Sequence, residues 1–187
     1  MKIGISGAKG SFSEEAGRTY AQKHALKRPS FEYLISVENV LAALEEGSID
    51  FGIFPIENSN GGIVIEAVHA MAKHRFKIKN IFEIDVHQNL LVRKGVTAGD
   101  VERIASHDQA IKQCRMYLKR MWPNVKVMEY VDTAKAAEDL ASGVLPVSTA
   151  VIASRAAAKA YKLDVLEESI QDLKFNFTSF IVAEPLA

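Results

Sequence analysis

Two patterns of apolar residues alternate along the chain. Short apolar runs predict buried strands, and segments with apolar residues every three to four positions predict amphipathic helices. The expected strands are Lys2–Ser6, Phe31–Ile35, Phe51–Phe54, one long or broken strand over Lys77–Val92, Val125–Val131, Leu145–Val147 and Thr178–Ala183. The expected helices are Ser11 to about His24, Ser36–Gly47, Ile63–His74, Ser106–Pro123, Asp132–Gly143 and Ala150–Tyr161. This alternation predicts an α/β fold with a mostly parallel sheet and helices on both faces.

The stretch Phe51–Val64, FGIFPIENSNGGIV, is the central candidate for a ligand site. Its strand is expected to stop at Pro55, which cannot donate a hydrogen bond within a sheet. Three polar residues and two glycines then precede a helical pattern, namely Glu57, Asn58, Ser59, Gly61 and Gly62. Unpaired N–H groups at a helix start favour anions, and glycine allows close approach to the backbone. The alternative is an ordinary surface loop, with Asn58 and Ser59 as turn formers.

Short polar turns between a strand and a helix are expected at four places. They are Gly7–Ser11, Pro55–Gly62, Ala105–Gln109 and Pro146–Thr149. The first lacks the spacing of a dinucleotide fingerprint and of a P-loop, and its Ser11 begins an S-x-x-E capping box. If these turns converge, their N–H groups and hydroxyls would suit a small anion such as a carboxylate, rather than a metal or a nucleotide.

Composition excludes several other classes of protein. The chain has 187 residues, which suits one domain or two small lobes, and its 23 basic and 23 acidic residues give no net charge. That balance argues against nucleic-acid and membrane-surface partners. The five histidines lack metal-ligand spacing. The single cysteine, Cys114, permits no intrachain disulfide, and there is no signal peptide or membrane-length apolar run, so a cytoplasmic protein is expected.

Four segments together resemble the catalytic domain of prephenate dehydratase. They are GAKGSFSEEA (Gly7–Ala16), FPIENSNGG (Phe54–Gly62), SHDQAIKQC (Ser106–Cys114) and NFTSF (Asn176–Phe180). Their order and spacing fit this family over essentially the whole chain. The resemblance implies two α/β lobes around a cleft, like type II periplasmic binding proteins. Lobe one would comprise residues of about 1–75 and 167–187, and lobe two those of about 76–166.

The resemblance also implies an activity. Prephenate would lose carbon dioxide and water to give phenylpyruvate, with no cofactor or metal, in an enzyme that commonly forms homodimers. Thr178 matches the threonine taken to assist the departing hydroxyl. Substrate contacts would come from Ser11, Asn58, Ser59, Gly61, Gly62, Ser106, Gln109, Asn176 and Phe180. Because the chain ends at Ala187, the family's C-terminal phenylalanine-sensing domain is expected to be missing.

One departure from the family pattern keeps other functions open. Ser179 stands where the family has arginine, and serine cannot supply its charge or its forked donor. The alternatives are a related prephenate or arogenate enzyme, such as a non-aromatising decarboxylase, or a non-catalytic binder of small carboxylates. By residue type alone, Thr178 could be an ordinary strand residue, and Ser11 and Ser106 simple helix caps.

Overall fold

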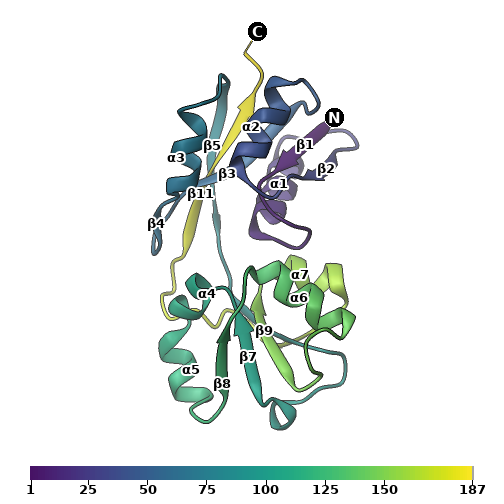
Figure 1. Ribbon diagram of the computed structural model, residues 1–187, viewed down its shortest axis with the longest axis vertical. Helices are drawn as coiled ribbons and strands as arrows, with labels where there is room; N and C mark the ends of the chain where they lie inside the picture. The colour runs from purple at the N-terminus through teal and green to yellow at the C-terminus, as the bar shows by residue number, and fades with distance from the viewer. Residues whose placement is uncertain (187) are drawn as a thin grey trace. The chain divides into compact units, whose positions relative to one another are not determined.

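The computed structural model describes residues 1–186 and divides them into two compact units (Figure 1). Unit 1 contains Met1–Ala8, Phe12–Asp85 and the segment from Phe175 onward, and unit 2 contains Lys9–Ser11 and Val86–Lys174. The chain passes from unit 1 to unit 2 after Asp85 and returns after Lys174. These two crossovers fall ten and eight residues later than predicted. The first is late because a strand of unit 1 continues to Asp85. The second is late because the Ile170 and Asp172 N–H groups donate to carbonyls within unit 2.

Unit 1 is built on a mixed sheet with the strand order β2-β1-β3-β11-β5, and β4 pairs with β3. The strands are β1 (Lys2–Ile5), β2 (Ser30–Tyr33), β3 (Phe51–Asn58), β4 (Gly62–Ile63), β5 (Lys77–Asp85) and β11 (Phe177–Glu184). The helices are α1 (Phe12–Lys23), α2 (Val37–Glu45) and α3 (Ile65–Met71). Apolar residues of α2 and α3 form one core cluster with Phe54 of β3 and Ile181 of β11.

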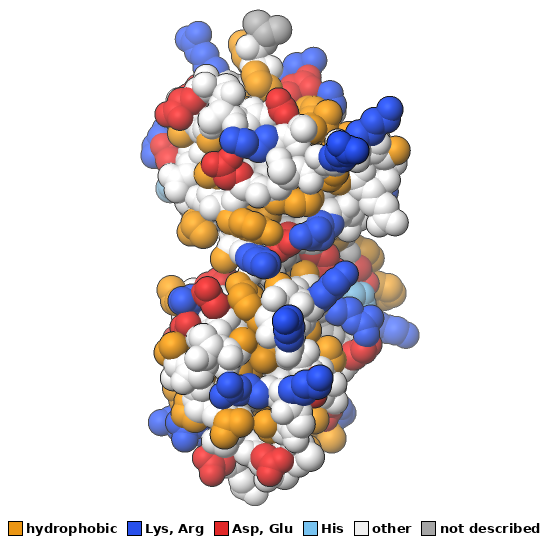
Figure 2. All heavy atoms as spheres, turned by 90° about the vertical axis from the view of Figure 1, so that its right-hand side faces the viewer, with side chains coloured by type: hydrophobic (Ala, Val, Ile, Leu, Met, Phe, Trp, Pro, Cys, Tyr) orange, Lys and Arg blue, Asp and Glu red, His pale blue; other side chains and the backbone are white. Residues whose placement is uncertain are grey.

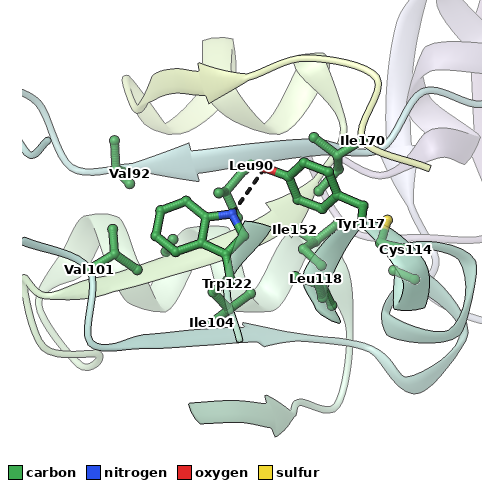
Figure 3. Packing of buried hydrophobic residues seen from close by; sticks show 12 residues of the cluster. Leu90, Val92, Val101, Ile104, Cys114, Tyr117, Leu118, Trp122, Ile152 and Ile170 are labelled. Carbon is green, nitrogen blue, oxygen red and sulfur yellow. Dashed lines mark hydrogen bonds between the residues drawn. The ribbon is translucent and has the colours of Figure 1, made fainter. Parts of the chain in front are cut away.

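Unit 2 has a second mixed sheet, with the order β10-β6-β9-β7-β8. Its strands are β6 (Asn89–Val92), β7 (Arg103–Ser106), β8 (Lys126–Glu129), β9 (Thr149–Ala153) and β10 (Asp164–Glu167). Its helices are η1 (Ala98–Asp100), α4 (Asp108–Gln113), α5 (Arg115–Met121), α6 (Thr133–Ser142) and α7 (Arg155–Tyr161). In one core cluster, the indole N–H of Trp122 donates to the Tyr117 hydroxyl at 3.0 Å (Figure 3).

The α/β class is confirmed, but the sheets are mixed rather than mostly parallel. The parallel pairs β1–β2, β1–β3, β7–β8 and β7–β9 are joined through helices. By contrast, β6 and β11 follow the crossovers and run antiparallel to their neighbours. Acidic and basic side chains both occur on each unit in the face shown in Figure 2.

The strand at the centre of unit 1 does not stop at Pro55, contrary to prediction. β3 continues to Asn58, and its register against β11 shifts between the pairs Pro55–Phe180 and Glu57–Ser179. This β-bulge leaves Ile56 as the extra residue, and a bulge is a position where a sheet tolerates proline. The next helix begins at Ile65 rather than Ile63, because β4 intervenes.

The alanine-rich segment was also predicted wrongly. Thr149–Ala153 is a fully buried strand between β6 and β7, whereas a strand at Leu145–Val147 and a helix from Ala150 were expected. Helix α7 begins only after Ser154, whose Oγ accepts a hydrogen bond from the N–H of Ala157 at 2.9 Å. Burial in the sheet therefore overrides the helix propensity of alanine.

His74 provides a pH-dependent link within unit 1. Its ring nitrogens lie 2.7 Å from Glu45 Oε2 and 3.1 Å from Glu38 Oε1, and the hydrogen bond with Glu45 is the main cause of its raised pKa. The charged pairing should be complete below the ordinary histidine pKa of about 6.5 and lost as the pH rises through the raised value. We expect a lower thermal midpoint at about pH 8.5 than at about pH 6.

Thermal unfolding at both pH values tests this prediction. His74→Gln should reduce the difference between the two midpoints. His69→Gln, on the exposed surface of α3, is the matched control and should leave the difference unchanged. An equal pH dependence in the wild type and His74→Gln would contradict the role given to this histidine.

Candidate functional site

The side chain of Asn58 joins the end of β3 to the start of β11. Its Nδ2 group donates to Asn176 Oδ1 at 2.9 Å, to the Phe177 carbonyl at 3.2 Å and to Thr178 Oγ1 at 2.8 Å. Asn58 and Thr178 are direct partners in the antiparallel pair, so their side chains leave the same face of the sheet. The amide group therefore holds the threonine hydroxyl in a defined position.

The other end of the same amide shapes the turn after β3. Asn58 Oδ1 accepts hydrogen bonds from the N–H groups of Asn60, at 2.9 Å, and Gly61, at 2.7 Å. Gly62 follows with a φ of +78°, a conformation that favours glycine. Asn58 is thus both a turn former and a bridge between strands, and the Gly61 N–H already serves the turn.

A second set of hydrogen bonds ties this turn to the segment before β11. The Ser59 N–H donates to the Phe177 carbonyl at 2.8 Å, and the Phe177 N–H donates to Ser59 Oγ at 3.0 Å. Asn60 Nδ2 donates to Asn176 Oδ1 at 3.1 Å. We call Asn58, Ser59, Asn60, Asn176 and Thr178 the Asn58 cluster.

Two contributors to this arrangement were missed from the sequence. Asn60 bridges to Asn176, and the Asp85 carboxylate accepts a hydrogen bond from the Asn176 N–H at 3.3 Å. The run of polar residues before Gly61 was a usable signal for Asn60. Asp85 gave a weaker one, as an acidic residue two positions before the polar break at His87–Asn89.

The hydroxyl of Thr178 is the most chemically useful group in the Asn58 cluster. The residue is 8% exposed, and its oxygen accepts the Asn58 bond. Within residues 1–186, no hydrogen bond uses the Thr178 hydroxyl proton as donor. Because an O–H group becomes a better donor when its oxygen accepts a hydrogen bond, this proton can be offered to a ligand oxygen.

The other substrate contacts predicted in unit 1 are Phe180, Gly61, Gly62 and Asn176, and each lies within the core or the turn of this unit. Phe180 is 1% exposed and stacks on Phe82 with ring centroids 6.0 Å apart, so it supports β11 from within the core. Gly61 and Gly62 are exposed in the turn. Asn176 is fully buried, and its carbonyl oxygen receives the two asparagine amides already described.

Three predicted contacts, Ser11, Ser106 and Gln109, belong to unit 2. Ser106 is the last residue of β7, and its fully buried hydroxyl donates to the Ile152 carbonyl at 2.6 Å, so it supports the sheet. The N-cap of α4 is His107, whose Nδ1 accepts from the Gln109 N–H at 3.3 Å, and not Ser106 as the sequence suggested. Substrate contacts by Ser11 and Gln109 stay predictions.

Ser179 faces away from the Asn58 cluster. It lies opposite Glu57 on β3 and Glu83 on β5, and its hydroxyl donates to Glu83 Oε1 at 3.1 Å. Successive residues of a strand point to opposite faces, so Ser179 and Thr178 are on different sides of the sheet. The serine therefore removes no side chain from the face that carries the threonine hydroxyl.

Replacing Ser179 with arginine should affect stability more clearly than catalysis. The guanidinium would lie between Glu57 and Glu83, two exposed carboxylates, and we expect a gain of about 0.5–1 kcal/mol in unfolding free energy. Turnover should change by less than about tenfold, because the new side chain faces away from Thr178. Denaturant unfolding and steady-state kinetics measure both effects, with Ser179→Gln as the uncharged control. A gain in turnover of a hundredfold or more would assign residue 179 to the reaction.

Residues 1–186 contain neither a candidate metal site nor a candidate membrane-spanning helix. No group of three or more His, Cys, Asp or Glu side chains there is placed to hold a metal ion. No helix in the same part of the chain has the length and apolarity to cross a membrane.

Comparison of the sequence with known proteins relates the chain to one family. The family model described as "Prephenate dehydratase" matches residues 3–185. The chain is 34% identical to "Arogenate dehydratase/prephenate dehydratase 6, chloroplastic" of Arabidopsis thaliana, over 97% of this chain and 43% of that protein. It is 35% identical to "Prephenate dehydratase" of Lactococcus lactis subsp. lactis, over 96% of this chain and 62% of that protein.

Solved structures give the same relationship. Prephenate dehydratase from Arthrobacter aurescens, solved in complex with L-Phe, superposes with a TM-score of 0.90 at 27% identity, covering 100% of this chain and 61% of that one. A periplasmic substrate-binding protein from Coxiella burnetii shares the fold, with a TM-score of 0.51 at 13% identity. The chain spans less than two thirds of the length of each of the three dehydratase relatives.

Proposed function

The chain belongs to the prephenate dehydratase family, and from this premise we propose that it is a carbon–oxygen lyase that converts prephenate to phenylpyruvate. The observation that carries the proposal is the Thr178 hydroxyl, which is held by Asn58 and has its own proton available to a ligand. The threonine and the asparagine both lie within segments that resemble the family, and they meet through a direct strand pairing.

The proposed reaction needs no cofactor. The bond from the ring to its carboxylate breaks, and the electron pair enters the ring as carbon dioxide leaves. The ring C–O bond then breaks, which makes the ring aromatic. Thr178 donates a hydrogen bond to the departing hydroxyl oxygen, which takes up one proton from solvent and leaves as water. Because a threonine hydroxyl is a weak acid, its value lies in fixed position and in the polarisation provided by Asn58.

Arogenate is the second candidate substrate, because the Arabidopsis relative carries both names. Arogenate has an amino group where prephenate has a side-chain keto group, and the reacting ring is the same. The same hydroxyl donor would therefore serve either compound. Prephenate would give phenylpyruvate, whereas arogenate would give phenylalanine.

Incubation of the purified protein with each substrate at neutral pH tests the proposal. Phenylpyruvate is followed by absorbance and phenylalanine by chromatography. We expect turnover of prephenate that exceeds the slow non-enzymatic reaction. Intact prephenate and arogenate after prolonged incubation would refute an enzyme of this type, and thermal stabilisation by either compound without turnover would then favour a carboxylate-binding protein.

We also propose that the protein acts as a homodimer in the cytoplasm. A reducing compartment suits the only cysteine, Cys114, which lies fully buried among apolar residues (Figure 3). Burial raises the pKa of its thiol, which makes the thiolate scarce. The observations in favour of a dimer concern strand β5 and are given below.

A further inference from the structure

Strand β5 is the last strand in the order of the unit 1 sheet and so forms one of its edges. It pairs with β11 on one side, and no other strand of residues 1–186 pairs with its outer side. At 9 residues it is long for an edge strand. An edge of this kind presents backbone N–H and C=O groups that another strand can bind.

Two isoleucines beside this edge are exposed to solvent. Ile78 is 46% exposed and Ile81 is 57% exposed. Their register partners on β11, Ala183 and Ile181, are two positions apart, so both isoleucines point to the same face of the sheet. Pairing of another strand along β5 would remove part of this apolar surface from water.

The charges of β5 are separated into a basic and an acidic half. Lys77 and Lys79 lie in the first half, and both pair with the Glu184 carboxylate, at 3.0 and 2.7 Å. Two positive charges therefore meet one negative charge at this end. Glu83 and Asp85 lie in the second half and give it the opposite sign.

A further carboxylate lies near the acidic half. Glu83 accepts a hydrogen bond from the neutral hydroxyl of Ser179. Glu57, opposite Ser179 on β3, adds a further negative charge on the same face. The two halves of β5 thus differ in sign along a strand whose outer edge is open.

We propose that β5 pairs antiparallel with β5 of a second copy, around a twofold axis at Ile81, and joins two unit 1 sheets into one. In this register Lys79 faces the Glu83 of the second copy, and Lys77 faces its Asp85. Parallel in-register pairing would place like charges together, so the charge pattern selects the antiparallel orientation. This inference deepens the proposed homodimer and does not depend on the proposed reaction.

The main-chain pairing is expected to centre on the regular part of β5. The register against β11 shifts between Val182 and Ala183, which leaves Lys79 as an extra residue on β5. With the axis at Ile81, the pairing that is regular on both strands covers Asn80–Phe82, and positions beyond Phe82 face the irregular segment of the second copy. The two lysines would reach the opposing carboxylates through their flexible side chains.

An engineered cysteine tests the twofold axis directly. Antiparallel partners have Cα atoms about 4.5–5.5 Å apart, a distance that a disulfide can bridge. Under mild oxidation, Ile81→Cys should form a covalent dimer on non-reducing gels, and reductant should reverse it. Ile63→Cys is the matched control, because Ile63 is 61% exposed on β4, and it should remain largely monomeric. Equal cross-linking of both variants would overturn the proposed register.

Charge exchange gives an independent test by sedimentation equilibrium. Lys79→Glu and Glu83→Lys should each weaken the dimer about tenfold, since each creates two like-charge pairs per dimer. The double variant should restore the dissociation constant to near that of the wild type. Thermal melts show whether each variant is folded. A monomeric wild type at about 100 μM would refute the homodimer and this interface together. A dimer insensitive to these changes would refute only the interface, and neither result would alter the turnover assay.

Discussion

Replacement of Thr178 with valine is expected to lower the kcat for phenylpyruvate formation by about a thousandfold. Valine keeps the branched shape of threonine but has no hydroxyl, so the departing oxygen loses its positioned donor. Asn58 keeps its other acceptors, Asn176 Oδ1 and the Phe177 carbonyl, so the cluster should stay folded. Steady-state assays with saturating prephenate measure this loss as a change in kcat.

The control for this prediction is Thr178→Ser, which keeps a hydroxyl at the same position. It should retain kcat within about tenfold of the wild type, because the hydrogen bond from Asn58 can re-form. Both variants should melt near the wild-type temperature. A Thr178→Val enzyme with full turnover would show that the hydroxyl takes no part in the reaction.

The second large effect is expected at Asn58. Asn58→Leu keeps the approximate size of the side chain but removes its donor to three oxygens and its acceptor for two backbone N–H groups. Several polar groups around a partly buried position would then lack partners, and we expect a loss of about 2–4 kcal/mol in unfolding free energy. Turnover should also fall, since the Thr178 hydroxyl would no longer be held.

Asn60→Leu is the matched control for this change. Asn60 is exposed, and within residues 1–186 its side chain donates only to the Phe175 carbonyl and to Asn176 Oδ1. Its removal should cost about 1 kcal/mol or less. Denaturant unfolding of the two variants side by side measures the difference, and equal losses would mean that Asn58 has no special place in the cluster.

The sequence predicted the class of fold and several local signals correctly. Alternating patterns identified most helices, and the helix predicted over Ser36–Gly47 starts at the residue that caps α2, since Ser36 accepts a hydrogen bond from the Asn39 N–H. Asp132 caps α6 in the same way, through the Lys135 N–H. These features depend on residues three positions apart, so a linear pattern is sufficient to find them.

The errors arose where distant segments decide the structure. Thr149–Ala153 has small residues suited to a helix, but its place between two strands of a buried sheet makes it a strand. The bond from Asn58 to Thr178 joins residues 120 positions apart, which no local pattern can specify. The motifs identified both residues, and only the strand pairing shows that they touch.

The bulge beside Pro55 has a consequence for changes in chain length. In a regular ladder that paired Ile56 with Ser179, the register counted from Pro55 and Phe180 would place Glu57 opposite Thr178; because Ile56 is bulged out, Asn58 lies there instead. In that regular ladder a carboxylate would meet the hydroxyl, and it would compete for the proton that the amide leaves available. Deletion of Ile56 would instead remove the bulge and leave Asn58 opposite Thr178. Relatives of this protein should therefore tolerate either a substitution or a gap at position 56, as long as Asn58 stays opposite Thr178.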